Sequence, residues 1–150
     1  MQSIQKIKKI KDSRILVRVD FNVPIENNKV RNDFKIQAAV PTINYLRKKG
    51  AKVILLSHIS GDGTETLAPV ATYLNKIFPV IFVPDIIGKD AIAAVASMAS
   101  GDVILLENLR KDAGEKENSK FFTIALASLG DIYVNEAFPE SHREYASIVG

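Results

Sequence analysis

The sequence contains no cysteine and no tryptophan, and it has only two histidines, His58 and His142. Without cysteine there can be no disulfide framework, no thiolate metal site and no cysteine nucleophile. Two histidines far apart in the chain also leave little for a zinc site, so we expect no bound metal. No apolar run reaches the roughly 18 residues of a membrane span, and the basic start lacks the apolar segment of a secretory signal peptide. We therefore expect a chain without membrane segments.

The length of 150 residues, with 47% hydrophobic and 25% charged residues, is ordinary for a soluble globular domain. A disordered tail would have too few apolar residues to match this composition. No internal repeat and no linker rich in proline, glycine or serine divides the sequence. We therefore predict a single domain over residues 1–150.

The net charge of +3 conceals an uneven distribution along the chain. Residues 1–52 carry 13 lysines and arginines and 4 acidic residues, whereas residues 53–150 carry 7 basic and 13 acidic residues. Such asymmetry favours an anionic ligand, either a nucleic acid or a small phosphorylated metabolite. Solvated surface lysines would produce the same excess. Because aromatic residues do not alternate with basic ones, binding of single-stranded nucleic acid is the weaker hypothesis.

Short apolar segments alternate with segments of helical spacing. The apolar segments are nearly continuous, as in strands that are buried on both faces of a parallel sheet. The predicted strands are residues 14–19, 52–57, 80–83, 103–106 and 131–134, and the predicted helices are residues 34–49, 67–77, 89–99 and 119–129. This order predicts an α/β fold with a doubly wound, Rossmann-like parallel sheet in a three-layer α/β/α arrangement.

Four residues provide local signals for the helix ends. Pro41 predicts a kink in the first helix, or a helix whose regular part begins near it. Gly50 is placed to end that helix. Ser119 is a predicted N-cap, and Gly130 is predicted to close the last helix in a left-handed conformation.

Polar side chains follow four of the five predicted strands, where ligands bind in folds of this class. Arg110 and Arg143 carry guanidinium groups that pair two-pronged with phosphate or carboxylate, and His58 could donate to the same anion. Asp20 could accept from a substrate hydroxyl or orient a neighbour such as Arg18, and Asn22 can donate and accept. Turn formation by Asp20 and Asn22, and an ordinary loop role for His58, remain open alternatives.

Several nucleotide-binding and hydrolase motifs are missing from the sequence. No G-x-G-x-x-G follows a strand, and no G-x-x-x-x-G-K-[ST] is present, so dinucleotide binding and a P-loop are unsupported. No G-x-S-x-G elbow occurs either.

The segments at the strand ends resemble those of the phosphoglycerate kinase family, in the same order along the chain. The similarity extends from about residue 14 to residue 149. The matching segments are residues 17–24 (VRVDFNVP), 38–43 (AAVPTI), 57–58 (SH), 105–110 (LLENLR), 126–138 (LASLGDIYVNEAF) and 141–143 (SHR).

This resemblance implies a glycolytic, cytoplasmic enzyme that transfers a phosphoryl group between 1,3-bisphosphoglycerate and ADP, giving 3-phosphoglycerate and ATP. In the family the N-terminal domain binds the phosphoglycerate and a C-terminal domain binds the magnesium nucleotide. The similarity covers the N-terminal domain only, so we expect the nucleotide domain to be missing from this chain and the chain alone to be inactive. The resemblance implies that Asp20 and Asn22 contact the glycerate, and that His58, Arg110 and Arg143 bind phosphate or carboxylate.

Two positions depart from the family pattern. Lys35 stands where the family usually has an arginine that assists the transferring phosphoryl group, which makes Lys35 the predicted catalytic residue as well as a substrate ligand. Gly61 stands where an arginine usually follows the Ser-His pair, and Asp62 adds an acid beside it. A lysine keeps the charge of arginine but loses its two-pronged fork. These departures leave open a degenerate, non-catalytic module that binds phosphoglycerate or another anion, and a generic flavodoxin-like domain is a third hypothesis.

Overall fold

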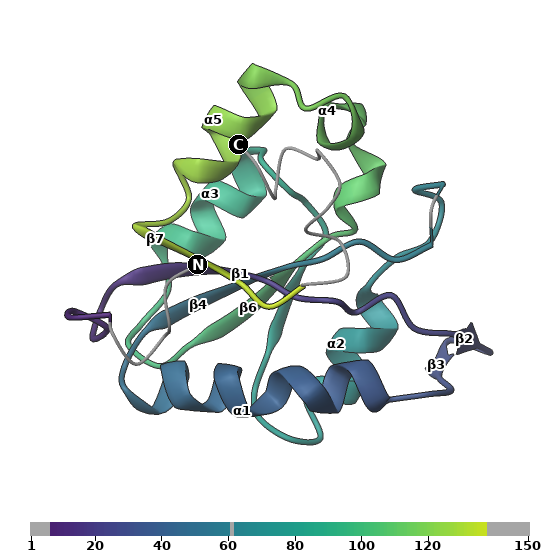
Figure 1. Cartoon of the computed structure of the whole chain (residues 1–150), viewed down its shortest axis with the longest axis horizontal. Coiled ribbons are helices and arrows are strands. Elements are labelled where there is room, and N and C mark those ends of the chain that lie inside the picture. The colour runs from purple at the N-terminus through teal and green to yellow at the C-terminus, as the bar shows by residue number, and fades with distance from the viewer. Residues whose placement is uncertain (1–6, 61, 138–150) are drawn as a thin grey trace.

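The computed structural model describes residues 7–60 and 62–137. Five parallel strands form one sheet in the order β5-β6-β4-β1-β7 (Figure 1). Their bounds are Arg14–Arg18 for β1, Lys52–Leu56 for β4, Ile81–Val83 for β5, Val103–Leu106 for β6 and Ile132–Asn135 for β7. The predicted strands are confirmed to within a residue or two at their ends. The parallel α/β fold is confirmed as well.

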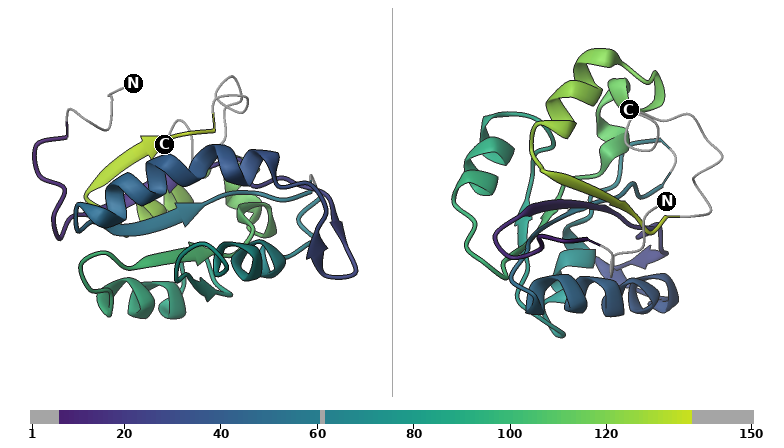
Figure 2. Two further views of the ribbon diagram at one scale, coloured as in Figure 1. Left: turned by 90° about the horizontal axis from the view of Figure 1, so that it is seen from below. Right: turned by 60° about the vertical axis from the view of Figure 1, so that its left-hand side comes forward.

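Helices cover both faces of this sheet. The main helices are α1 (Phe34–Lys48), α2 (Ala68–Leu74), α3 (Lys89–Ala96) and α5 (Lys120–Ala127). Helices α1 and α2 lie on one side and α3 and α5 on the other, and the right-hand view of Figure 2 shows the sheet between α1 and α5. In β4, Val53 and Leu55 pack with α1 and α2, whereas Ile54 and Leu56 pack with α3 and α5. Both sheet faces are therefore buried, which explains the near-continuous apolar strands.

The helix ends agree with most of the local signals. Helix α1 begins at Phe34 and continues through Pro41, so a regular helix starting near the proline is wrong. Gly50 follows this helix with a φ of 89°, and the Ser119 side chain accepts from the amide of Phe122 as an N-cap. Gly130 does not have a positive φ, so its predicted left-handed conformation is wrong. A Cβ at Gly130 would lie 2.6 Å from Cγ of Leu16, so close packing against β1 requires glycine there.

Several short elements were not predicted from the sequence. Strands β2 (Ile25–Glu26) and β3 (Lys29–Val30) form a hairpin whose turn residues, Asn27 and Asn28, have φ values of 52° and 60°. Asparagine tolerates this conformation better than most residues, so the Asn-Asn pair was the available signal. After β6 the chain forms the 3₁₀ helix η2 (Leu109–Lys111) and the short helix α4 (Ala113–Lys116). Among the described residues, no helix has both the length and the apolar character needed to cross a membrane.

Candidate functional site

Three neighbouring strands bring the predicted site residues to one edge of the sheet. Strand β4 lies between β1 and β6, and all three are parallel, so their carboxyl ends share an edge. His58 follows β4, Asp20 and Asn22 follow β1, and Arg110 follows β6. Lys35 joins them from the first turn of α1. Arg143, the remaining predicted site residue, lies outside the described residues.

An ion pair links Lys35 to the loop after β1. The Lys35 ammonium lies 3.2 Å from Oδ2 of Asp20 and donates to the backbone oxygen of Asn22 at 3.2 Å. Oδ1 of Asp20 also accepts from the amide of Asn22 at 3.1 Å. The Lys35 side chain is 47% exposed and that of Asp20 is 14% exposed. Asp20 therefore holds the ammonium at the sheet edge while leaving it accessible to solvent.

The side chain of Asn22 connects this loop to the one after β4. Its Oδ1 accepts from the amide of Ser60 at 3.0 Å, so the amide group of the same side chain remains for a ligand. In the β4 loop, Oδ1 of Asp62 accepts from Thr64 N, Thr64 Oγ1 and Ser60 Oγ. Hydrogen bonds from the Thr64 backbone and hydroxyl, followed by the Ser60 hydroxyl, lower the pKa of the Asp62 carboxyl. The loop after β4 therefore keeps the Asp62 carboxylate negatively charged close to the carboxyl edge of the sheet. Gly61 lies outside the described residues.

His58 is buried beside a charged pair that sequence reasoning did not identify. The imidazole Nδ1 lies 3.4 Å from Nη2 of Arg18, the last residue of β1. Nη1 of Arg18 lies 3.8 Å from Oε2 of Glu115 in α4, and both side chains are fully buried. This contact joins the end of β1 to α4, nearly a hundred residues later in the chain, so no local sequence signal pointed to Glu115.

A buried asparagine joins the loop of His58 to the loop of Arg110. Oδ1 of Asn108 accepts from the amides of Ile59 and Arg110, each at 3.1 Å, and its Nδ2 donates to the Ile59 oxygen at 2.8 Å. Gly63 has a φ of 77°, and a Cβ there would lie 2.3 Å from the backbone oxygen of Arg110. Glycine is therefore required for the β4 loop to approach the Arg110 backbone.

Two other acids near the strand ends hold loops and helix ends in place. Glu107, which follows β6, accepts from Thr66 Oγ1 at 2.7 Å, Leu67 N at 3.0 Å and Asn108 N at 2.7 Å. Asp85, which follows β5, accepts from the amide of Ala91 at 2.9 Å in the first turn of α3. Their oxygens satisfy backbone donors, so we assign both a structural role. Within the described part of the chain, no group of three histidine or acidic side chains is arranged to hold a metal ion.

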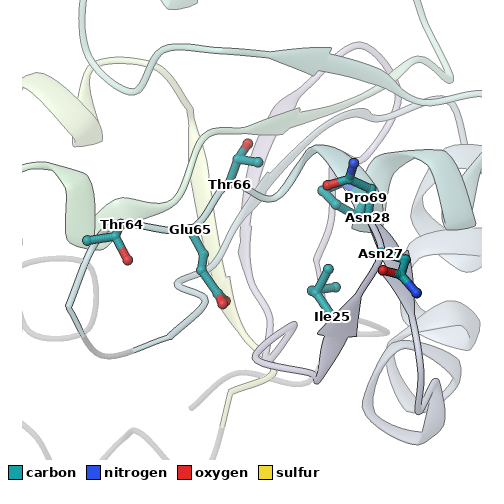
Figure 3. Close-up of a pocket in the computed structure, with 7 residues that line it drawn as sticks. All are labelled: Ile25, Asn27, Asn28, Thr64, Glu65, Thr66 and Pro69. Carbon is teal, nitrogen blue, oxygen red and sulfur yellow. The ribbon is translucent and has the colours of Figure 1, made fainter.

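A hollow of about 350 Å³ lies between the β2-β3 hairpin and the segment leading into α2 (Figure 3). It contains none of the predicted site residues. Its only charged lining residue is Glu65, so it lacks a cationic group for an anion. The residues that line it are Ile25, Asn27, Asn28, Thr64, Glu65, Thr66 and Pro69.

Comparison with known proteins identifies the family. The model of the phosphoglycerate kinase family matches residues 4–150, nearly the whole chain. This chain belongs to the phosphoglycerate kinase family. Curated relatives include the phosphoglycerate kinase of Azorhizobium caulinodans, 49% identical over 143 residues, and that of Synechococcus elongatus, 48% identical over 149 residues. These alignments cover 91% and 94% of this chain but 36% and 37% of the relatives.

Solved phosphoglycerate kinase structures agree with the fold. The enzyme from Pyrococcus horikoshii matches with a TM-score of 0.92 at 31% identity, and the match covers 100% of this chain and 40% of that one. The enzyme from Coxiella burnetii matches with a TM-score of 0.85 at 34% identity, covering 97% and 37% of the two chains. The chain thus spans little more than a third of the length of the phosphoglycerate kinases it matches, and over that span it has their fold.

Proposed function

We propose that this chain is the phosphoglycerate-binding part of a phosphoglycerate kinase. The observation that supports the proposal is that Asp20, Asn22, His58 and Arg110 follow three adjacent parallel strands at one sheet edge, where Lys35 pairs with Asp20. Cationic side chains next to a carboxylate and an amide suit a ligand that has both an anionic phosphate and a hydroxyl group. 3-Phosphoglycerate and 1,3-bisphosphoglycerate are such ligands.

The family resemblance assigns a role to each residue. Asp20 and Asn22 would bind the glycerate hydroxyl, and His58 and Arg110, together with Arg143, would bind phosphate or carboxylate. Lys35 would stabilise the phosphoryl group during transfer, because this chemistry depends on positioning and on neutralising the equatorial oxygens. Its salt bridge to Asp20 fixes the ammonium near the predicted glycerate position.

The other substrate, a magnesium nucleotide, requires groups that we do not find in the described residues. These residues contain no cluster of three metal-ligating side chains, and the sequence has no P-loop. The family resemblance implies that a separate domain binds the magnesium nucleotide, and this chain matches only 36–37% of the length of its relatives, so we propose that ADP and Mg²⁺ bind to a domain outside this span. Under this proposal the domain of residues 1–150 acts in the cytoplasm and is inactive by itself.

One observation favours a second candidate, a non-catalytic module that binds phosphoglycerate. The Lys35 ammonium is already engaged by Asp20 and Asn22, and a lysine cannot form the two-pronged contact that the family's arginine can form. Combining the chain with the separately expressed nucleotide domain of a relative distinguishes the two candidates. Turnover of 1,3-bisphosphoglycerate and ADP supports the kinase, whereas binding without turnover supports the module.

Titration calorimetry tests the binding proposal directly. We expect the chain to bind 3-phosphoglycerate more tightly than either glycerate or inorganic phosphate, because only the full ligand engages both halves of the site. Affinity should fall as salt increases, since the phosphate contacts are charged. Equal affinity for 3-phosphoglycerate and inorganic phosphate would reduce the site to a general anion site. The absence of binding at millimolar ligand would overturn the proposal.

A further inference from the structure

The hydroxyl group of Tyr73 ties helix α2 to the start of helix α1, which lies on the same side of the sheet (Figure 1). The hydroxyl donates to the Asp33 carboxylate and accepts from Nε2 of Gln37 at 2.6 Å. The ring of Tyr73 is half-buried and packs against the core on this side of the sheet, so α2 determines where the hydroxyl lies. Asp33 and Gln37 are four residues apart, so Tyr73 contacts both ends of one helical turn.

The Asp33 carboxylate does not have the role that its position predicts. Asp33 is the N-cap residue of α1, where an aspartate usually accepts from a backbone amide of the first turn. The Asp33 side chain makes no capping hydrogen bond and accepts from Tyr73 instead. This hydrogen bond, and then burial, raise the pKa of the Tyr73 hydroxyl, so the group remains a donor. The carboxylate thus links α1 to α2 rather than satisfying the end of its own helix.

Lys35 lies in the turn that Tyr73 contacts. Two residues correspond to about 200° of rotation in a helix, so Lys35 projects from the face opposite to Asp33 and Gln37. Its ammonium reaches Asp20 and the backbone oxygen of Asn22 in the β1 loop, each at 3.2 Å. The turn is therefore held on one face by α2 and on the other by the β1 loop.

The start of α2 is itself fixed at the carboxyl edge of the sheet. Its N-cap residue, Leu67, donates its backbone amide to Oε1 of Glu107 at 3.0 Å, and Glu107 follows β6. Tyr73 therefore connects the turn of Lys35 to the end of β6 by a path that does not pass through the ion pair with Asp20.

We propose that Tyr73 is a positioning residue for Lys35: through Asp33 and Gln37 it fixes the first turn of α1, so that the ammonium is held beside the β1 loop before a ligand binds. The use of Lys35 in phosphoglycerate binding rests on the proposed function. The control of the Lys35 position by Tyr73 does not.

The position of Lys35 can be measured without any ligand. The substitution Tyr73→Phe removes only the hydroxyl and keeps the ring in the core. Nuclear Overhauser contacts between the ε-methylene protons of Lys35 and the protons of Asp20 report how closely the two side chains are held together. We expect these contacts in the unmodified chain and weaker ones in Tyr73→Phe. Contacts of equal strength in the two proteins would overturn the proposal.

Calorimetry with 3-phosphoglycerate separates positioning from a merely structural role. We expect Tyr73→Phe to bind about threefold more weakly, near the lower end of what the loss of one hydrogen bond costs. In the Lys35→Met background the same substitution should leave the affinity unchanged, because the group that Tyr73 positions is no longer present. An equal loss in both backgrounds would show that Tyr73 acts on the fold alone, and the proposal would fail.

The chain offers a matched control on the same helix. Tyr45 lies near the other end of α1, where its ring faces the Lys49 ammonium at 5.8 Å. Tyr45→Phe removes a hydroxyl far from Lys35, so it should change neither the Overhauser contacts nor the affinity. Losses as large as those of Tyr73→Phe would overturn the proposal. If the contacts depend on Tyr73 but the unmodified chain does not bind 3-phosphoglycerate, the positioning role stands and the proposed function fails.

Discussion

The two ends of strand β1 carry the same kind of ion pair in opposite surroundings. At the amino end, the guanidinium of Arg14 lies 3.0 Å from the carboxylate of Asp131, and the two side chains are 37% and 49% exposed. At the carboxyl end, the side chains of Arg18 and Glu115 are both fully buried, and their closest charged atoms are 3.8 Å apart. The exposed pair has the better geometry and costs little desolvation, whereas the buried pair has a large desolvation cost. Charge is thus buried at the edge where we propose that the ligand binds.

The largest effect should come from removing one member of the buried pair. We expect Arg18→Met to lower the free energy of unfolding by about 3–5 kcal/mol, because the Glu115 carboxylate then remains buried without that countercharge. Urea denaturation measures the loss. The double variant Arg18→Met with Glu115→Met should recover most of this stability, since neither member of the pair then stays buried without the other. If Arg18→Met lowered the free energy of unfolding by less than about 1 kcal/mol, the buried pair would behave like an exposed one, and the difference between the two ends of β1 would be contradicted.

The half-exposed pair of Lys35 and Asp20 should give an intermediate effect, on binding rather than on stability. We expect Lys35→Met to weaken 3-phosphoglycerate binding by about 1.5–3 kcal/mol, the usual contribution of a hydrogen bond to a charged group. Lys35→Arg should bind at least as tightly as the unmodified chain because its fork can make two contacts. Calorimetry at fixed salt compares the three proteins. Unchanged affinity in Lys35→Met would remove Lys35 from the site.

The exposed pair at the amino end should give a small effect that depends on pH. Hydrogen bonds and charge from Arg14 lower the pKa of the Asp131 carboxyl in the folded chain. A carboxyl with a lowered folded pKa stabilises the fold above its unfolded pKa of about 3.9, and this contribution disappears as the pH falls through the folded pKa. We expect Arg14→Met to cost about 0.2–1 kcal/mol at pH 7 and progressively less as the pH falls below about 3.9. Thermal unfolding between pH 7 and pH 2 checks the prediction, and an equal cost at the two ends of this range would contradict it.

The smallest effect should come from Asp62, whose charge is exposed. The substitution Asp62→Asn would keep an Oδ1 acceptor for Thr64 and Ser60, while the negative charge beside the proposed site would be lost. We expect 3-phosphoglycerate to bind roughly twofold more tightly, since an exposed charge is largely screened at physiological salt. Asp62→Ala removes the acceptor as well and serves as the control for loop order. Weaker binding by Asp62→Asn would show that the charge itself contributes to the site.

The fold could be predicted from the sequence because its signals are local. Continuous apolar segments such as residues 52–57 mark strands that are buried on both faces, and helical spacing marks the segments between them. Gly130 shows where this reasoning fails. It follows a helix, as a left-handed cap would, but glycine is needed there because Leu16 of β1 packs against it. That contact joins residues far apart in the sequence, so no local pattern reveals it.

Much of the candidate site was predictable for a different reason. Parallel strands place their carboxyl ends together, so Asp20, Asn22, His58 and Arg110 could be grouped before the structure was known. Lys35 follows no strand and was identified only through the family resemblance; its contact with Asp20 spans α1 and the β1 loop. The pairing of Arg18 with Glu115 depends on the placement of a four-residue helix, which propensity alone does not determine.

A residue-by-residue map of 3-phosphoglycerate binding tests the central claim most directly. Amide signals of the nitrogen-15 labelled chain would be followed as the ligand is added to millimolar concentration. We predict shifts at Asn22, Lys35, His58 and Arg110 at the carboxyl edge, with Arg14 and Asp131 at the amino edge unchanged. Shifts confined to the amino edge, or no shifts at either edge, would contradict the assignment of ligand binding to the carboxyl ends of β1, β4 and β6.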